Sequence, residues 1–206
     1  KSFNKIFNQN NRNVIQPKVS AIPKFMNNND YILIATQVAN DFSLIEEGYP
    51  YIGTTKLYLD LIDTILKNSK FNIIIKTHPW ENKKVNLYTS YTKDRIVEEL
   101  SKYDKEIKSR LLVLEDANIK QLIDDSKHFI TINSQSALEA CAYGKKPIVI
   151  GKTFYSHNGF TYDINSIDEV IDIINKKPDI LDLDEFKILS EFISDLFSFH
   201  LVPIFP

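Results

Sequence analysis

The sequence predicts an α/β fold built on a doubly wound parallel sheet, and three observations support this. Five short apolar runs, near residues 31–36, 71–76, 111–114, 128–132 and 147–150, are typical of buried strands. Helical patterns separate these runs, and no repeat or low-complexity block interrupts the alternation. Short, continuously apolar strands that alternate with helices indicate a parallel sheet covered on both faces.

The predicted helices follow from apolar side chains spaced three and four residues apart. Leu57, Leu61 and Ile65 share one face of the first helix, and Ile96 and Leu100 share one face of a charged helix. The expected helices cover residues 54–68, 93–107, 119–126, a short stretch after Ser134, 166–175 and 184–199.

Composition limits the classes of protein that fit. The 206 residues, 43% of them hydrophobic, suffice for one domain with a real core. A net charge of −2 gives no electrostatic footprint for nucleic acid. Cys141 is the only cysteine, which excludes an internal disulfide and a cysteine-based zinc site, and we expect it to be a small buried residue. No apolar run is long enough to span a bilayer.

The chain divides into two parts. Residues 1–30 are polar and rich in asparagine, which predicts a linker or the remnant of a preceding domain. Residues 31–206 form the predicted Rossmann-like, nucleotide-binding domain with its C-terminal helices.

Polar residues follow the second strand as Lys76-Thr77-His78-Pro79. Pro79 restricts His78 to an extended backbone. A histidine held in this way can donate to a phosphate oxygen, and Lys76 can add positive charge. A solvated histidine at a polar strand end is the alternative interpretation.

A long loop, residues 37–53, follows the first strand and begins at Gln37. It exceeds the roughly 2–6 residues of most βα connections, and such loops often carry function. Asp41 is its candidate nucleophile or base for sugar transfer. Alternatively, Asp41 caps a local turn and faces water.

A third motif starts a helix after the fourth strand. Free amides there favour an anion, and the hydroxyls of Ser134 and Ser136 can join them. Glu139 can accept from a ribose hydroxyl. A plain N-cap at Asn133 or Ser134 is the alternative. The nucleotide-binding candidates are Lys76, His78, Asn133, Ser134, Gln135, Ser136 and Glu139.

The loop after the fifth strand is aromatic and contains glycine, as a pocket wall does. The candidate residues of the donor pocket are Gln37 and, from this loop, Phe154, Tyr155, Gly159 and Thr161. No GxGxxG, GxxxxGK[ST], HExxH or strand-end DxD pattern is present, so we expect neither a metal ion nor another cofactor.

The order of these motifs resembles the capsule polysaccharide biosynthesis family of bacterial Kdo transferases. The resemblance covers about residues 31–163 and rests on the loop from Gln37 to Asp41, the His78-Pro79 pair, the segment from Thr131 to Pro147, and the loop from Gly151 to Thr161. It implies a retaining glycosyltransferase that takes Kdo from CMP-β-Kdo. It also implies that His78 and Ser134 lie at the CMP phosphate and that Asp41 is the nucleophile or electrostatic stabiliser.

The resemblance further implies a domain like the nucleotide-binding half of a GT-B enzyme. We therefore expect an N-terminal Rossmann-like half that is missing from this chain, and a lipid-linked or polysaccharide acceptor. We expect a cytoplasmic protein, either free or peripheral at the inner face of the inner membrane. Three alternatives remain open. The donor can be CMP-sialic acid, because the HP pair also resembles bacterial sialyltransferases. The chain can be a UDP-sugar transferase or 2-epimerase. It can also be a non-catalytic scaffold of a capsule assembly complex.

Overall fold

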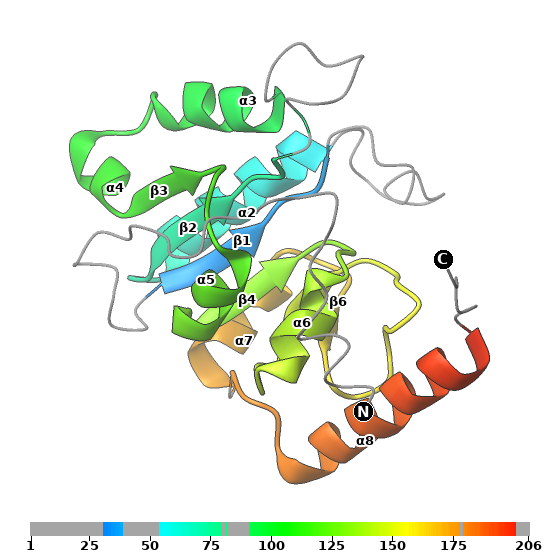
Figure 1. The fold of residues 1–206 in the computed structure, drawn as a ribbon. Coiled ribbons are helices and arrows are strands. Elements are labelled where there is room, and N and C mark those ends of the chain that lie inside the picture. The colour runs from blue at the N-terminus through cyan, green and yellow to red at the C-terminus, as the bar shows by residue number, and fades with distance from the viewer. Residues whose placement is uncertain (1–30, 39–53, 80, 82–90, 178, 201–206) are drawn as a thin grey trace.

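The computed structural model describes residues 31–38, 54–79, 81, 91–177 and 179–200 (Figure 1). Within them, six strands form one all-parallel sheet in the order β3-β2-β1-β4-β5-β6. The strand order reverses between β1 and β4, as in doubly wound sheets. The predicted fold class is therefore confirmed. The strands are β1 (Tyr31–Ala35), β2 (Asn72–Lys76), β3 (Leu111–Leu114), β4 (His128–Thr131), β5 (Ile148–Ile150) and β6 (Tyr162–Ile164).

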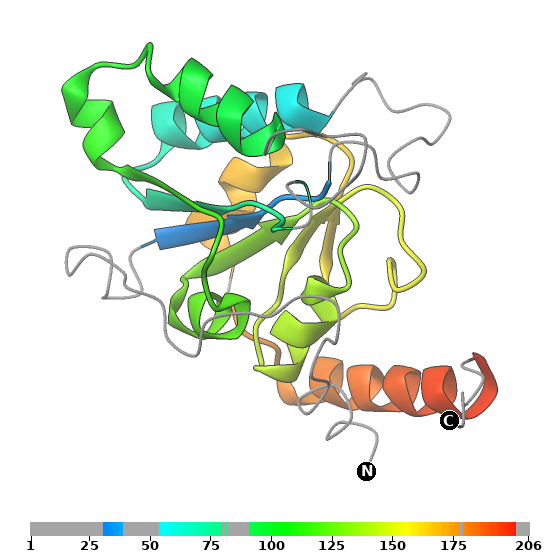
Figure 2. The same cartoon turned by 45° about the horizontal axis from the view of Figure 1, so that its top comes forward.

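Helices cover both faces of the sheet and bury two apolar clusters. One cluster includes Ile73 and Ile75 of β2, whereas Ile74 between them belongs to the other, as the alternation of side chains along a strand requires. Figure 2 shows α2 and α3 on one side of the sheet and α8 on the other. The first layer comprises α2 (Thr54–Asn68), α3 (Tyr91–Leu100) and α7 (Glu169–Lys176), and the second α5 (Ile119–Asp125), α6 (Ser136–Ala142) and α8 (Leu183–Asp195).

All five predicted strands are present, and the helix over residues 54–68 is confirmed. The prediction of one helix over residues 93–107 is wrong. The chain forms α3 and then a separate α4 (Lys105–Ser109), because the Asp104 side chain accepts from the Ile107 amide at 2.9 Å and begins a new helix. The last predicted helix ends earlier than expected: α8 stops at Asp195, and the π-helical turn η4 (Leu196–His200) follows.

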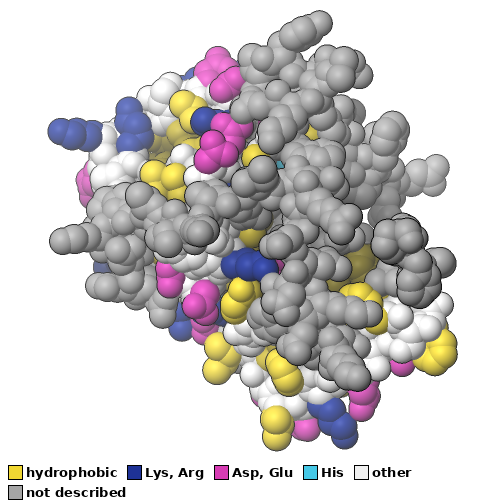
Figure 3. Space-filling view, in the orientation of Figure 1, with side chains coloured by type: hydrophobic (Ala, Val, Ile, Leu, Met, Phe, Trp, Pro, Cys, Tyr) yellow, Lys and Arg dark blue, Asp and Glu magenta, His cyan; other side chains and the backbone are white. Residues whose placement is uncertain are grey.

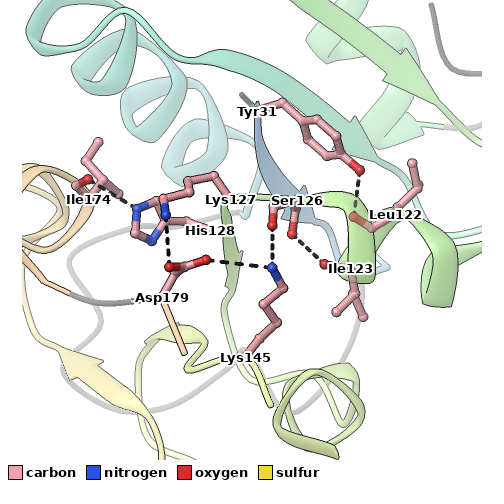
Figure 4. A network of polar contacts seen from close by, with 9 residues as sticks. All are labelled: Tyr31, Leu122, Ile123, Ser126, Lys127, His128, Lys145, Ile174 and Asp179. Carbon is pink, nitrogen blue, oxygen red and sulfur yellow. Dashed lines mark hydrogen bonds and ion pairs between the residues drawn. The ribbon is translucent and has the colours of Figure 1, made fainter. Parts of the chain in front are cut away.

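Polar contacts fasten the end of the sheet where the strands begin (Figure 4). Asp179 pairs with Lys127 at 3.1 Å and with Lys145 at 3.7 Å. Burial alone would raise the pKa of Asp179, but the hydrogen bond from Lys127 and the charge of both lysines lower it. His128 contacts the Ile174 carbonyl through Nε2 at 3.1 Å. Ligands of open α/β sheets bind at the opposite end, where the strands finish.

Cys141 is fully buried in α6, as expected, and its thiol lies 3.5 Å from the Phe160 carbonyl oxygen. Burial raises the pKa of this thiol, which makes it an inert core residue. None of the described helices is long and apolar enough to cross a bilayer. The predicted linker, residues 1–30, lies outside the described residues.

Candidate active site at the sheet's switch point

The candidate site is built on three neighbouring strands that end at one edge. Strand β1 pairs with β2 on one side and with β4 on the other. Because all three are parallel, the segments that follow Ala35, Lys76 and Thr131 emerge at the same edge. Adjacent strands lie about 4.8 Å apart, so the β2 and β4 segments begin roughly 10 Å from each other. Ligands of open α/β sheets bind at such a reversal of strand order.

Gln37 connects the loops that follow β1 and β4. Its backbone amide donates to the hydroxyl of the buried Tyr58 at 2.8 Å. Its side-chain Oε1 accepts from the backbone amide of Asn133 at 3.4 Å. Two segments 96 residues apart in sequence are thereby joined at the switch point. Gln37 is itself buried, so it positions these loops rather than facing solvent.

Lys76 is a buried cation at the end of β2. Lys76 is only 6% exposed. Its ammonium donates to the Thr77 carbonyl at 2.8 Å. Burial lowers the pKa of Lys76 to about 8, although the nearby carboxylates Asp116 and Glu115 oppose this shift. At neutral pH the side chain is therefore still mostly charged. A partly desolvated ammonium at a strand end is suited to a phosphate.

His78 follows on a backbone that is fixed on both sides. The Thr77 amide donates to the Leu114 carbonyl at 2.8 Å, which attaches the segment to β3. The His78 carbonyl accepts from the Glu81 amide at 3.4 Å, and Pro79 lies between them. His78 itself is half-buried.

The turn before α6 is organised by its serines. Ser134 Oγ accepts from the Ser136 amide at 3.2 Å and from the Ser136 hydroxyl at 2.8 Å. The residue that precedes α6 is Gln135, which is exposed and makes no side-chain cap. Neither Asn133 nor Ser134 is therefore the N-cap, and the Ser134 hydroxyl still has a proton to donate.

The loop from Gly151 to Thr161 forms a wall beside this turn. The buried Tyr155 donates its hydroxyl to the Ser134 carbonyl at 2.6 Å. His157 has a φ of 62°, a strained conformation for a residue with a side chain, and its amide donates to Asp163 at 2.9 Å. The Thr161 hydroxyl also donates to Asp163, at 3.0 Å. Tyr155 and Thr161 thus hold the loop in shape.

Phe154 and Gly159 are exposed in the same loop, as are Lys152 and His157. Phe154 is 57% exposed, and its ring stacks on Phe192 of α8 at a centroid distance of 6.4 Å. Gly159 has a φ of 98°, so a side chain would be strained there. A Cβ at Gly159 would lie 3.8 Å from Ile188, so both residues lie beside α8. Their role as walls of a donor pocket stays a prediction.

Glu139 lies on α6, one turn beyond the serines. It is half-buried, and burial raises the pKa of its carboxyl, while the charge of Lys120 opposes the shift. A carboxylate in this environment gains from a hydroxyl donor. The contact of Glu139 to a ribose stays a prediction.

The family model for capsule polysaccharide biosynthesis proteins matches residues 4–185. The chain belongs to this family. The resemblance drawn from its motifs is thus confirmed at the level of the family. No curated protein is significantly similar to the chain in sequence.

Three solved structures share part of their fold with this family member. Two are from Thermosulfurimonas dismutans. One is KpsC, beta Kdo 2,4 transferase, with 19% identity and a TM-score of 0.46, and the other is KpsC, beta Kdo 2,7 transferase, with 19% identity and a TM-score of 0.43. Each comparison covers 84% of this chain and 46% of the KpsC chain. The third is TarM, with 14% identity and a TM-score of 0.48, where 87% of this chain aligns with 33% of the other. The chain therefore spans less than half the length of these proteins.

The structure adds site residues that sequence reasoning missed. Glu115 and Asp116 follow β3 at the same edge, and Glu115 pairs with Lys93 of α3 at 3.0 Å. Thr36 Oγ1 is buried directly after β1 and has no hydrogen-bond partner among the described residues. Because all parallel strands end at one edge, the residues directly after β3 and after β1 could have been identified as site candidates from the sequence. Asp41, the predicted nucleophile, lies outside the described residues.

Charge on the visible face of the molecule is mixed. On the face seen in Figure 3, acidic and basic side chains of the described residues are interspersed. Within the part of the chain that the structure describes, no three His, Cys, Asp or Glu side chains are grouped to hold a metal ion. Among the described residues at this edge, Lys76 lies at the end of β2 and the exposed Lys152 lies two residues after β5, while Lys93 is paired with Glu115.

Proposed function

We propose that this chain is the donor-binding part of a glycosyltransferase of capsule polysaccharide synthesis, which transfers Kdo from a CMP-activated donor. Membership of the capsule polysaccharide biosynthesis family supports the pathway. One observation carries the donor chemistry: the segment with Lys76 and His78 and the Ser134–Ser136 turn leave strands that flank β1 at the switch point. A nucleoside monophosphate can bridge these two segments.

The proposed reaction is displacement at the anomeric carbon of the donor. The bond from that carbon to the phosphate oxygen breaks, and CMP leaves with the bonding electron pair. Lys76, His78 and the Ser134 hydroxyl neutralise the charge that develops on the phosphate. Asp41 either attacks the anomeric carbon and is then displaced by an acceptor hydroxyl, or stabilises the oxocarbenium-like state while that hydroxyl attacks. In both cases the acceptor oxygen forms the new glycosidic bond and its proton passes to the released phosphate or to water. Glu139 holds the ribose of the nucleotide.

The remaining partners follow from the same proposal. The acceptor is a lipid-linked saccharide or a growing polysaccharide, and an N-terminal Rossmann-like half supplies most contacts to it. Work on such an acceptor places the enzyme in the cytoplasm, at the inner face of the inner membrane. The reaction as proposed needs no metal ion or other cofactor.

Calorimetry with CMP, UMP and UDP tests the donor assignment. CMP should bind more tightly than UMP and UDP. His78→Ala should weaken CMP by roughly tenfold or more, since a hydrogen bond to a charged group contributes about 1.5–3 kcal/mol. His200→Ala, on η4, is the matched control and should leave the Kd for CMP unchanged.

Each alternative predicts a different result. Preference for UDP would indicate a UDP-sugar transferase or 2-epimerase. Failure to bind any of the three nucleotides would favour a non-catalytic scaffold. Equal CMP affinity of wild type and His78→Ala would remove His78 from the site. Competition of CMP-Kdo against CMP-sialic acid then decides the sugar.

A further inference from the structure

Glu81 is a buried carboxylate beside the His78 segment. It is 0% exposed, and its two oxygens accept from one residue at the start of α3. Oε2 accepts from the Thr92 amide at 2.8 Å, and Oε1 accepts from the Thr92 hydroxyl at 2.5 Å. Thr92 is equally buried. An acidic side chain at a helix N-terminus satisfies a free amide and complements the helix dipole.

The same residue closes the turn that contains His78. The Glu81 amide donates to the His78 carbonyl at 3.4 Å, and Pro79 limits the backbone between them. On the other side of His78, the Thr77 amide is attached to β3 through Leu114. His78 is therefore held between one anchor on β3 and one anchor on α3.

The start of α3 is itself fixed against the site. Lys93, next to Thr92, pairs with Glu115 in the segment that follows β3. Helix α3 packs on α2 through the buried Ile96 and Leu100. Glu81 therefore attaches the His78 turn to an element that cannot move independently of the sheet.

We propose that Glu81 is the positioning residue for His78. Its carboxylate fastens the 78–81 turn to the N-terminus of α3, so that the imidazole stays at the strand edge where a phosphate binds. The role of the imidazole at a phosphate rests on the proposed function above. The mechanical link from Glu81 to His78 does not.

The first test of this link needs no nucleotide. The chain contains four histidines, His78, His128, His157 and His200. Their imidazole NMR signals can be assigned with a His78→Gln variant. Glu81→Ala should shift or broaden the His78 signal and leave the other three in place. Glu81→Gln should retain the wild-type signal, because its amide can accept from the Thr92 amide and donate to the Thr92 hydroxyl.

Two further variants keep this test decisive. Asp182→Ala removes another helix-capping carboxylate, that of α8, and should leave the His78 signal unchanged. Thr92→Val removes only the hydroxyl contact, so it serves if Glu81→Ala fails to fold, and it should shift the His78 signal alone. An unchanged His78 signal in folded Glu81→Ala and Thr92→Val, or equal movement of all four histidine signals in them, would overturn the proposal.

CMP affinity provides the second test. Glu81→Ala should weaken CMP about tenfold in the wild-type background, and less than about twofold in a His78→Ala background, where nothing remains to be positioned. If CMP binding depends on His78 but not on Glu81, the positioning role is overturned and the proposed function stands. If the His78 signal responds to Glu81→Ala while wild type binds no CMP, the link is confirmed and the proposed function fails.

Discussion

Tyr155 donates its hydroxyl to the backbone carbonyl of Ser134 at 2.6 Å. The two residues lie in different loops, one after β5 and one after β4. Tyr155 is fully buried, so its ring occupies a fixed place in the core while its hydroxyl holds the turn that begins α6. The bond makes the shape of the candidate phosphate turn depend on the neighbouring loop.

Tyr155→Phe should separate this contact from packing. The ring remains while the hydrogen bond is lost, so the free energy of unfolding should fall by about 1 kcal/mol. CMP binding should weaken as well, because the Ser134 turn loosens. Tyr31→Phe is the matched control, since Tyr31 is a buried tyrosine that donates to the Leu122 carbonyl at 2.7 Å. It should lose similar stability in urea denaturation and retain the wild-type Kd for CMP.

Lys76→Met should stabilise the protein and impair nucleotide binding. Burial lowers the pKa of Lys76 from 10.5 to about 8. One pKa unit corresponds to about 1.4 kcal/mol, so removing this charge should raise the free energy of unfolding by up to about 3 kcal/mol at pH 7. CMP should bind roughly tenfold more weakly because a charged phosphate contact is lost. Urea denaturation and calorimetry on the same samples measure both effects.

The gain from Lys76→Met should depend on pH in a defined direction. Between pH 8 and 10.5 the unfolded wild-type chain holds a proton on Lys76 that the folded chain has released. Wild-type stability therefore rises through this window, and the advantage of the variant should disappear by about pH 10.5. An advantage independent of pH would mean that the desolvation of Lys76 is not its source.

Asp41→Ala should abolish sugar transfer in the full-length enzyme and leave CMP binding near normal. A group that acts on the sugar carbon contributes mainly in the transition state. If Asp41 only caps its loop, the variant should instead lose stability and retain its turnover per folded molecule. A turnover assay with CMP-Kdo, with folding monitored in parallel, decides between these roles.

The five predicted strands could be recognised because buried strands of a parallel sheet have uninterrupted apolar runs in the sequence. Strand β6 was missed, since Tyr162–Ile164 has three residues with Asp163 in the middle, and this pattern does not differ from a loop. The break between α3 and α4 was missed for a different reason. The apolar spacing continues from Leu100 to Ile107, and only the capping bond of Asp104 shows that a second helix begins.

The candidate site was predictable to the level of strand ends. Lys76 ends a predicted strand, His78 and Ser134 each follow one, and parallel pairing places all three at one edge. The contacts that organise them could not be predicted, because Gln37 to Asn133 and Tyr155 to Ser134 join residues 96 and 21 positions apart. The contact of Glu81 to Thr92 could not be predicted either, since Thr92 lies eleven residues further along the chain.

Glu139→Gln should stabilise the protein at neutral pH. Burial raises the pKa of the Glu139 carboxyl, so the folded chain releases this proton at a higher pH than the unfolded chain. The stability that Glu139 contributes is therefore fully present below the unfolded pKa of about 4.5 and is lost as the pH rises through the folded pKa. Glu139→Gln should be more stable than wild type at pH 7, and the difference should vanish below pH 4.5. The exposed Glu191→Gln on α8 is the control and should have a free energy of unfolding close to that of wild type at pH 7.

A ribose contact gives Glu139 a second, independent readout. If the carboxylate accepts a hydrogen bond from the 2′-hydroxyl, wild type should prefer CMP to 2′-deoxy-CMP by roughly tenfold or more, since a hydrogen bond to a charged group contributes about 1.5–3 kcal/mol. Glu139→Ala should bind the two nucleotides equally. Its affinity for 2′-deoxy-CMP should stay near that of wild type, because that ligand never made the contact. A wild-type protein that does not distinguish the two nucleotides, or an alanine variant that still does, would place the 2′-hydroxyl elsewhere and leave the raised pKa of Glu139 as a property of the core alone.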